Sequence, residues 1–280
     1  MFGSPNSSFA ASIKVSTENS IFAGDTSILY VYLDTEGQVV NSVDGSLALS
    51  DEDNGNFEVQ EISLANSVFT MWPRKPSLEI DNTISFVGGS PEGLSGNMLL
   101  LYKVIVKINA PGEFSVTPNE VTVYLHDGQG SSVKTNSDVS KIVVGEPRGS
   151  VQNKWQEIVS KDNTAPRAFT IDLLQDPVLY DGKKFILFET TDTESGVNYY
   201  EVKEGDYPFV RSGTTYVLID QNSDKDIVVI AYDKAGNFQT STLKQKAPIN
   251  WTGVVIAVLV IVLIRKMIRR FRRKRNKINA

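Results

Sequence analysis

The sequence predicts an all-β chain with two β-sandwiches followed by one C-terminal transmembrane helix. In residues 12–145 and 167–245 apolar and polar side chains alternate, and Gly, Asn, Asp or Pro interrupts the alternation about every eight to twelve positions. This spacing is typical of antiparallel sandwiches. Residues 146–166 form a linker between these segments, and an uncharged run with a strongly basic end follows the second one.

The first segment is expected to contain strands and no helix. In the strand Ile28–Leu33, Leu29, Val31 and Leu33 should face the core, while Tyr30 and Tyr32 should face the other way. Pro73 and Pro76 should break the strand that reaches Trp72, because proline has no amide hydrogen for the ladder. The other predicted strands are Ser12–Ser16, 44–50, Phe57–Ile62, Val68–Trp72, Thr83–Val87, Met98–Lys107, Gly112–Val116, Val121–His126 and Lys141–Val144.

The linker, residues 146–166, contains one predicted helix. Val151, Trp155, Ile158 and Val159 recur at the spacing that places them on one face of a short amphipathic helix. We expect this helix to dock Trp155 against a neighbouring domain. In the second segment the predicted strands are Ala168–Leu173, Lys184–Glu189, Tyr199–Lys203, Thr215–Ile219, Asp226–Tyr232 and Phe238–Leu243.

The C-terminal end predicts a membrane anchor. Residues 252–264 carry no charge, and nine basic residues without an acid follow them. At 1.5 Å per residue this run reaches about 20 Å, so we extend the span to residues 249–268 to cross a hydrocarbon core of about 30 Å. The residues assigned to the span are Trp251, Val254, Leu259 and Ile264, and those assigned to its cytoplasmic border are Arg265, Lys266, Arg269 and Arg270.

The distribution of basic residues also predicts the orientation. Because basic residues collect on the cytoplasmic side, residues 269–280 should be a cytoplasmic tail and the N-terminal region should be extracellular. The expected location is therefore the cell membrane, crossed once. Residues 1–11 are interpreted as the remnant of a signal peptide or as a disordered tail.

Composition narrows the classes of partner. The chain has 33 acidic and 28 basic residues, and nine of the basic ones follow Ile264. The remainder is acidic, which disfavours nucleic acid as a ligand. The absence of Cys excludes disulfides and thiolate metal sites. In an extracellular chain it also suggests a prokaryotic source.

We assign no residue to catalysis, to a cofactor or to a metal. His126 is the only histidine, so a Ser-His-Asp triad would depend on it alone. The stretch DEDNGN at residues 51–56 has the Asp-x-Asp spacing of a calcium loop. However, Gly55 comes one position early and no Glu occupies the twelfth position, so a solvated acidic turn is the preferred interpretation. Asp192 and Glu194 are interpreted as exposed acids.

Two stretches of the first segment resemble cohesin domains. They are AGDTSILYVYLDTEGQVVNSVDGSLALS at residues 23–50 and NTISFVGGSPEGLSGNMLLLYKVIVKINAPGEFSVTPNEVTVYLHDGQGSS at residues 82–132. The shared features are a Gly-Asp before the second strand, an ISF-GG-P-G segment and a long apolar strand that ends in Lys. The resemblance implies a nine-stranded jelly roll, which in cellulosomal cohesins binds dockerin modules through one flat sheet face. It also implies partner contacts at Asp44 and at Glu92, in the loop after strand 83–87.

The residues themselves permit such a face. If Leu47 and Leu49 point inward, Asp44 and Ser46 point outward from strand 44–50, and Ser85 points outward from strand 83–87. Small side chains with hydrogen-bonding ends suit a flat surface that packs against a helix. Asp44, Ser46, Ser85 and Glu92 are thus predicted to bind a dockerin-like protein.

An alternative is carbohydrate binding by the same segment. A sugar ring stacks on an exposed aromatic face, and Tyr30, Tyr32 and Trp72 are the candidates. Tyr30 and Tyr32 should lie about 7 Å apart on one face of a strand. The competing interpretation is that all three side chains pack within the sandwich.

The second segment resembles bacterial immunoglobulin-like surface domains. The resemblance rests on DNTAPRAFTI, TDTESGVNYYEV and VVIAYDKAGN, in which Gly236-Asn237 supplies a hairpin turn. Such domains mostly act as spacers. The sequence as a whole predicts a cell-surface binding protein, not an enzyme. Its first domain should capture a dockerin-type module or, alternatively, a polysaccharide, and a structural envelope protein is the third interpretation.

Overall fold

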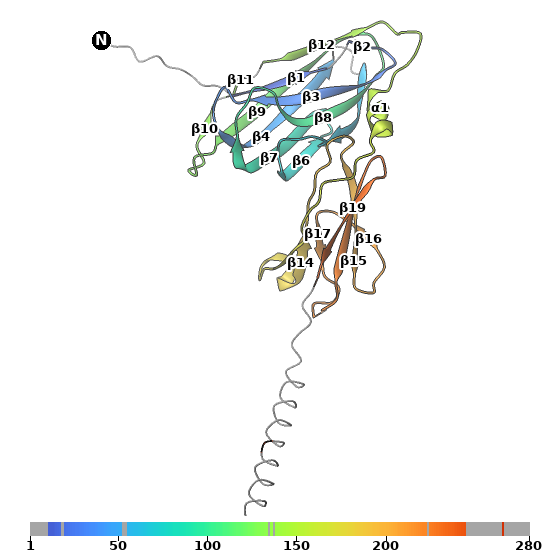
Figure 1. The fold of residues 1–280 in the computed structure, drawn as a ribbon. Helices are drawn as coiled ribbons and strands as arrows, with labels where there is room; N and C mark the ends of the chain where they lie inside the picture. The colour runs from blue at the N-terminus through green and yellow to red at the C-terminus, as the bar shows by residue number, and fades with distance from the viewer. Residues whose placement is uncertain are drawn as a thin grey trace, which may run out of the picture.

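The computed structural model describes residues 11–17, 20–51, 55–133, 135–136, 138–222, 224–244 and Arg265. The described part forms two β-rich units that follow each other along the chain, with the helix α1 (Lys154–Lys161) between them (Figure 1). The predicted all-β character is therefore confirmed for this part of the chain.

The first unit consists of two sheets. A five-stranded sheet has the order β11-β1-β3-β8-β5, and its strands are β11 (Thr135–Asn136), β1 (Ala11–Ser16), β3 (Thr26–Asp34), β8 (Leu99–Ile108) and β5 (Phe57–Ser63). A seven-stranded sheet has the order β2-β12-β9-β4-β7-β6, with β10 also paired to β9. Its strands are β2 (Ile21–Phe22), β12 (Ser140–Gly145), β9 (Gly112–Leu125), β4 (Val40–Asp51), β7 (Thr83–Leu94), β6 (Met71–Leu78) and β10 (Ser132–Val133).

The core of the first unit lies between these two sheets. Alternate side chains of β3 and β4 enter it, and Leu29, Val31, Leu47 and Leu49 are all buried. The alternation predicted for β3 and for strand 44–50 is thus confirmed. Because both sheets bury one face against the other, this unit is a β-sandwich.

The prediction that Pro73 and Pro76 break a strand is wrong. Both prolines lie inside β6, the edge strand of the larger sheet. The register between β6 and β7 shifts between Met71 and Arg74, and again between Arg74 and Ser77. Each proline therefore falls where the ladder is already interrupted, and its missing amide hydrogen costs little. The strand predicted at Val68–Trp72 begins only at Met71.

Two further strand predictions need correction. Residues 112–116 and 121–126, predicted as separate strands, form the single strand β9. The strand β4 pairs with β9 along this length, and the register of the pairing shifts between Asp44 and Ser46. The shift lies close to Glu120, whose φ is +48°. A bulge of this kind lets one strand continue where the turn residues Pro118 and Asn119 suggest a break.

The second unit also has two sheets. Its three-stranded sheet, in the order β13-β14-β17, contains β13 (Asp172–Gln175), β14 (Lys184–Leu187) and β17 (Thr215–Val217). Its four-stranded sheet, in the order β16-β15-β18-β19, contains β16 (Val210–Ser212), β15 (Val197–Glu204), β18 (Ile227–Asp233) and β19 (Phe238–Leu243). A separate buried cluster fills the space between them, including Ile186, Val202 and Val229.

The six strands predicted for the second unit are present with shifted ends. The first begins at Asp172 rather than at Ala168, and the sequence pattern missed β16 and the short 3-10 helix η1 (Leu179–Gly182). Gly236 has a φ of +93° in the connection from β18 to β19, which is a conformation that favours glycine. The predicted hairpin turn is therefore confirmed.

Helix α1 docks Trp155 on the first sandwich as predicted, but it begins only at Lys154, so Val151 lies outside the helix and is 70% exposed. Asn153 caps its N-terminus by accepting a hydrogen bond from the amide of Gln156. Trp155 is buried in a cluster with Ile28, Tyr30, Leu100 and Ile105 on the outer side of the five-stranded sheet. The linker is thus part of the folded first unit rather than a free tether.

No helix within the described ranges is long and apolar enough to cross a membrane. The predicted span at residues 249–268 lies outside those ranges apart from Arg265, as does most of the N-terminal segment 1–11. The anchor therefore stays a prediction from the sequence.

Candidate functional site

Three of the four predicted partner-binding residues come together on one sheet face. Ser46 of β4 lies directly opposite Ser85 of β7, and Asp44 lies opposite Val87. All three side chains are half-buried, while their neighbours Leu47 and Phe86 point into the core. This surface, here called the β9–β4–β7 face, carries Asp44, Ser46, Ala48, Ser50, Thr83, Ser85, Val87, Ser115 and Thr117.

The β9–β4–β7 face is rich in hydroxyl groups. The Ser46 hydroxyl donates to the carbonyl of Asn119 at 3.1 Å, and the Ser50 and Ser115 hydroxyls lie 2.9 Å apart. Asp44 forms an ion pair with Arg74 of β6 at 3.8 Å. Both side chains of this pair are about half exposed, so it contributes little to stability. It leaves a carboxylate and a guanidinium at the surface for a partner.

Glu92 does not join this group. It is exposed, but it lies within β7 rather than in a loop, because β7 continues to Leu94. The register passes from Ser42–Gly89 to Val40–Leu94, so Glu92 falls in an irregular part of the strand. At about 3.4 Å per residue it lies roughly 17 Å along the strand from Val87, the residue opposite Asp44.

The aromatic platform predicted from Tyr30 and Tyr32 is wrong for Tyr30. The two rings stack with centroids 6.2 Å apart and planes 15° apart. Tyr30 is only 7% exposed, however, because helix α1 places Trp155 against it. Tyr32 is half-buried beside the same cluster. The outer face of the five-stranded sheet is therefore covered where a sugar would have to stack.

Trp72 lies in a different place. It is half-buried and packs edge-on against Phe69 and Tyr102, with ring centroids 5.5 and 6.4 Å away. It also lines a cavity of about 270 Å³ between the first and second sandwiches, together with Lys75 and Tyr200. The three aromatic candidates thus do not form one surface, since Trp72 is on β6 and the tyrosines are on β3.

The two sandwiches meet at a charged and aromatic junction. Lys234, in the connection after β18, forms an ion pair with Glu61 of β5, and the indole nitrogen of Trp155 donates to the same carboxylate at 3.0 Å. The Lys234 ammonium also lies 5.1 Å from the Trp155 ring centroid. Burial lowers the pKa of Lys234 to about 8. These contacts join the first sandwich, the linker helix and the second sandwich at one point.

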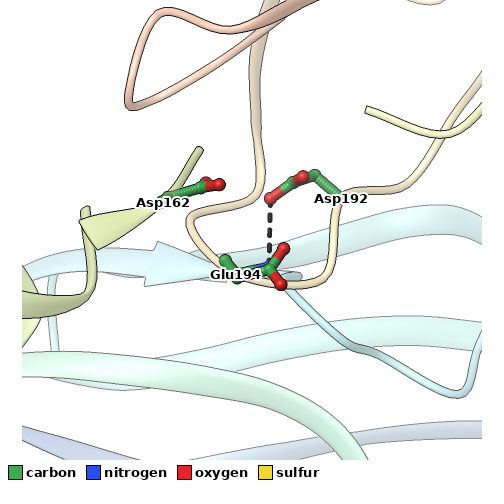
Figure 2. Close-up of side chains that lie close together, drawn as sticks. All are labelled: Asp162, Asp192 and Glu194. Carbon is green, nitrogen blue, oxygen red and sulfur yellow. Dashed lines mark hydrogen bonds between the residues drawn. The ribbon is translucent and has the colours of Figure 1, made fainter. Parts of the chain in front are cut away.

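One group of carboxylates in the described residues could hold a metal ion. Asp162, Asp192 and Glu194 each offer an oxygen, and these oxygens all lie within 4.8 Å of one another (Figure 2). The prediction that Asp192 is an exposed acid is wrong, because only 3% of the residue is exposed. Sequence reasoning missed the group because Asp162 belongs to the linker and the other two belong to a loop of the second unit.

The residues assigned to the membrane cannot be placed by the structure. Trp251, Val254, Leu259, Ile264, Lys266, Arg269 and Arg270 lie outside the described ranges. Arg265 is described and is exposed.

Comparisons with known proteins give structural likenesses only, because neither a family model nor a curated protein matches the chain. A non-cellulosomal cohesin from the archaeon Archaeoglobus fulgidus is similar at 18% identity and a TM-score of 0.40, over 48% of this chain and 91% of that one. A chain of a type I cohesin–dockerin complex from Clostridium thermocellum is similar at 14% identity and a TM-score of 0.41, over 52% and 100% of the two chains. A cohesin module from a Clostridium perfringens family 33 glycoside hydrolase is similar at 13% identity and a TM-score of 0.39, over 50% and 99%. At these identities and TM-scores the likenesses do not decide the family or the partner of this chain.

Proposed function

We propose that this chain is a membrane-anchored binding protein of the cell surface. Its first sandwich captures a helical protein module of the dockerin type, and its second, immunoglobulin-like sandwich acts as a spacer above the membrane. The anchor and the cytoplasmic tail rest on the uncharged run and the basic residues at the C-terminal end. The nature of the partner rests on the cohesin-like sequence stretches and on the β9–β4–β7 face.

The observation that carries the proposal is the contrast between the two outer faces of the first sandwich. The β9–β4–β7 face presents short side chains with hydroxyl groups, beside the ion pair of Asp44 with Arg74. The opposite outer face is occupied by Trp155 of the linker helix. A helix about 10 Å wide can lie flat on small side chains, and their hydroxyls can exchange hydrogen bonds with it.

The same contrast argues against the carbohydrate alternative. A polysaccharide needs aromatic rings that are open to solvent, whereas Tyr30 is covered and Trp72 packs against the core. The described surface of the β9–β4–β7 face carries no aromatic side chain among the residues that define it. The surface of the first sandwich therefore suits a protein partner better than a polysaccharide.

A binding assay with a bulky substitution tests the proposal. The full chain is offered a panel of recombinant dockerin-type modules in the presence of calcium, and insoluble polysaccharides in parallel. The variant S46R places an arginine in the middle of the β9–β4–β7 face, and the matched control T240R places the same residue at an exposed position of β19 in the second sandwich. We expect S46R to weaken dockerin binding at least about thirtyfold, as for a central contact of about 2 kcal/mol.

The outcomes separate the alternatives. Loss of binding in S46R with full binding in T240R supports the proposal. If no dockerin-type module binds, or if S46R binds as well as the parent chain, the proposed face is wrong. Retention on a polysaccharide that S46R leaves unchanged would instead move the first sandwich to the carbohydrate-binding class.

A further inference from the structure

We infer that Asp162, Asp192 and Glu194 form a binding site for a hard divalent cation, calcium in chemical class, where the linker meets the second sandwich (Figure 2). This site is distinct from the β9–β4–β7 face and does not depend on the function proposed for that face.

The three carboxylates are held in place by the backbone around them. Asp162 is the C-cap of α1, and it accepts hydrogen bonds from the amides of Thr164 and Ser195 at 2.9 and 3.1 Å. Asp192 accepts from the amides of Glu194 and Gly196 at 3.2 and 2.7 Å. The loop 192–196 and the end of the helix are thus fixed against each other with their carboxyl groups on the same side.

The local charge is unbalanced without a cation. Asp162 and Asp192 are buried, and a third buried carboxylate, Asp233, lies near Asp192. The nearby Lys234 does not neutralise the negative charge of these carboxylates, because its ammonium group is paired with Glu61. Buried carboxylates are normally paired with a cation or coordinate a metal ion.

A fourth oxygen points to a ligand in the same place. The hydroxyl of Ser195 is completely buried and has no hydrogen-bond partner. Ser195 is held at the Asp162 carboxylate by its own amide, which donates to that group at 3.1 Å. A buried hydroxyl without a partner is costly, and coordination to a cation or to its bound water would satisfy it.

The donor set selects the class of ion. All candidate ligands are oxygens, and the group contains no His or Cys that would favour zinc or copper. These oxygens all lie within 4.8 Å of one another, so one cation can contact all three. Calcium accepts irregular sets of oxygen ligands, whereas magnesium demands a near-ideal octahedron and usually keeps several of its waters, so we expect calcium to bind more tightly.

A bound cation would also stiffen the junction between the two sandwiches. The loop that carries Asp192 and Glu194 contacts the first sandwich directly, because the Asp192 carbonyl accepts from the amide of Asn66 at 3.1 Å. Gly196, at the end of this loop, comes so close that an added Cβ would lie 3.0 Å from the Ser63 oxygen. Fixing this loop to Asp162 therefore fixes the second sandwich to the linker helix and the first sandwich.

Calorimetric titration of the calcium-free full chain tests the inference. The protein, purified in a mild detergent and freed of metal with a chelator, is titrated with CaCl2 and separately with MgCl2. The main variant is E194Q, because its amide oxygen can still accept from Thr164 and Thr193, the present partners of Glu194. The control is D127N, which also replaces a carboxylate by an amide. Asp127 accepts a hydrogen bond from the amide of Gln129, two residues further along the chain, just as Asp192 accepts one from Glu194. D192N is a second variant, and circular dichroism checks the folding of each.

We expect one calcium ion per chain with a dissociation constant of about 10⁻⁴ to 10⁻³ M and weaker binding of magnesium. E194Q and D192N should each weaken calcium binding at least tenfold, and D127N should leave it unchanged. Calcium should raise the unfolding temperature of the parent chain and of D127N but not of E194Q. The inference is overturned if the parent chain shows no saturable calcium binding at about 10 mM. It is also overturned if a folded E194Q or D192N binds calcium like the parent.

Discussion

Replacing Trp155 by alanine should detach helix α1 from the first sandwich and lower its stability by about 3 kcal/mol. Only 8% of Trp155 is exposed, and it packs with Tyr30, Leu100 and Ile105. An aromatic side chain of this kind buries about 150–250 Å², which at about 25 cal/mol per Å² corresponds to about 4–6 kcal/mol. We expect less than this upper bound, because the cluster lies on an outer face where water can enter the gap.

The variant W155F separates packing from hydrogen bonding. It keeps an aromatic ring against Tyr30 but removes the indole nitrogen, which donates to Glu61 at 3.0 Å. Since Lys234 still pairs with Glu61, the loss should be about 1–2 kcal/mol. Phe238→Ala is the matched control, because this aromatic residue is 58% exposed and its truncation should cost less than about 0.5 kcal/mol.

Urea denaturation followed by circular dichroism measures these differences, and hydrogen exchange shows where they act. In W155A the amides of Ile158 and Val159, which lie on the docked helix, should lose their protection while those of β8 keep it. The reasoning is refuted if W155A loses less than about 1 kcal/mol and the helix amides stay protected.

Three further predictions concern single positions. Gly88→Ala should cost about 1–3 kcal/mol in urea denaturation, because its Cβ would lie 2.6 Å from the Trp72 ring, whereas Gly213→Ala, in open space, should be neutral; equal effects would contradict this. Tyr102→Phe should keep the stability or raise it by about 1 kcal/mol, since the Tyr102 hydroxyl is buried without a partner, and a clear loss would show that an unseen partner exists. Because burial lowers the pKa of Lys234 from 10.5 to about 8, the unfolded chain binds more protons between these values. The free energy of unfolding should therefore rise from pH 8 to 10.5, and K234M should remove that slope; a flat profile in the parent chain speaks against the burial of this amine.

Much of the first sandwich could be predicted because its strands bury one face only. Leu47 and Leu49 alternate with Asp44 and Ser46 in the sequence, and the structure buries the first pair and leaves the second at the surface. The side-chain period of a strand is two, so this assignment needs no knowledge of the neighbouring strands. The pairing of Ser46 with Ser85 depends on the register, which the sequence pattern does not contain.

The errors come from contacts between elements that are distant in the sequence. Alternation correctly turned Tyr30 away from the core of the sandwich, but it could not show that Trp155 of the linker would cover it. In the same way, the spacing of Asp192 and Glu194 says nothing about Asp162, which the helix end brings to them. Pro73 was misread for a related reason, because an edge position tolerates proline and only the sheet order reveals the edge.

The junction also sets the direction in which the β9–β4–β7 face is open. Lys75 of β6 pairs with Glu189 of the second unit at 3.4 Å, so the β6 edge of the larger sheet borders the second sandwich. Arg74, the residue before Lys75, forms its ion pair with Asp44 from this same edge. The sheet continues the other way through β9 to β12, whose Val143 is 70% exposed. The helical partner that we propose would therefore have room to extend from Asp44 and Ser46 across β9, whereas one that extended past β6 would meet the second sandwich.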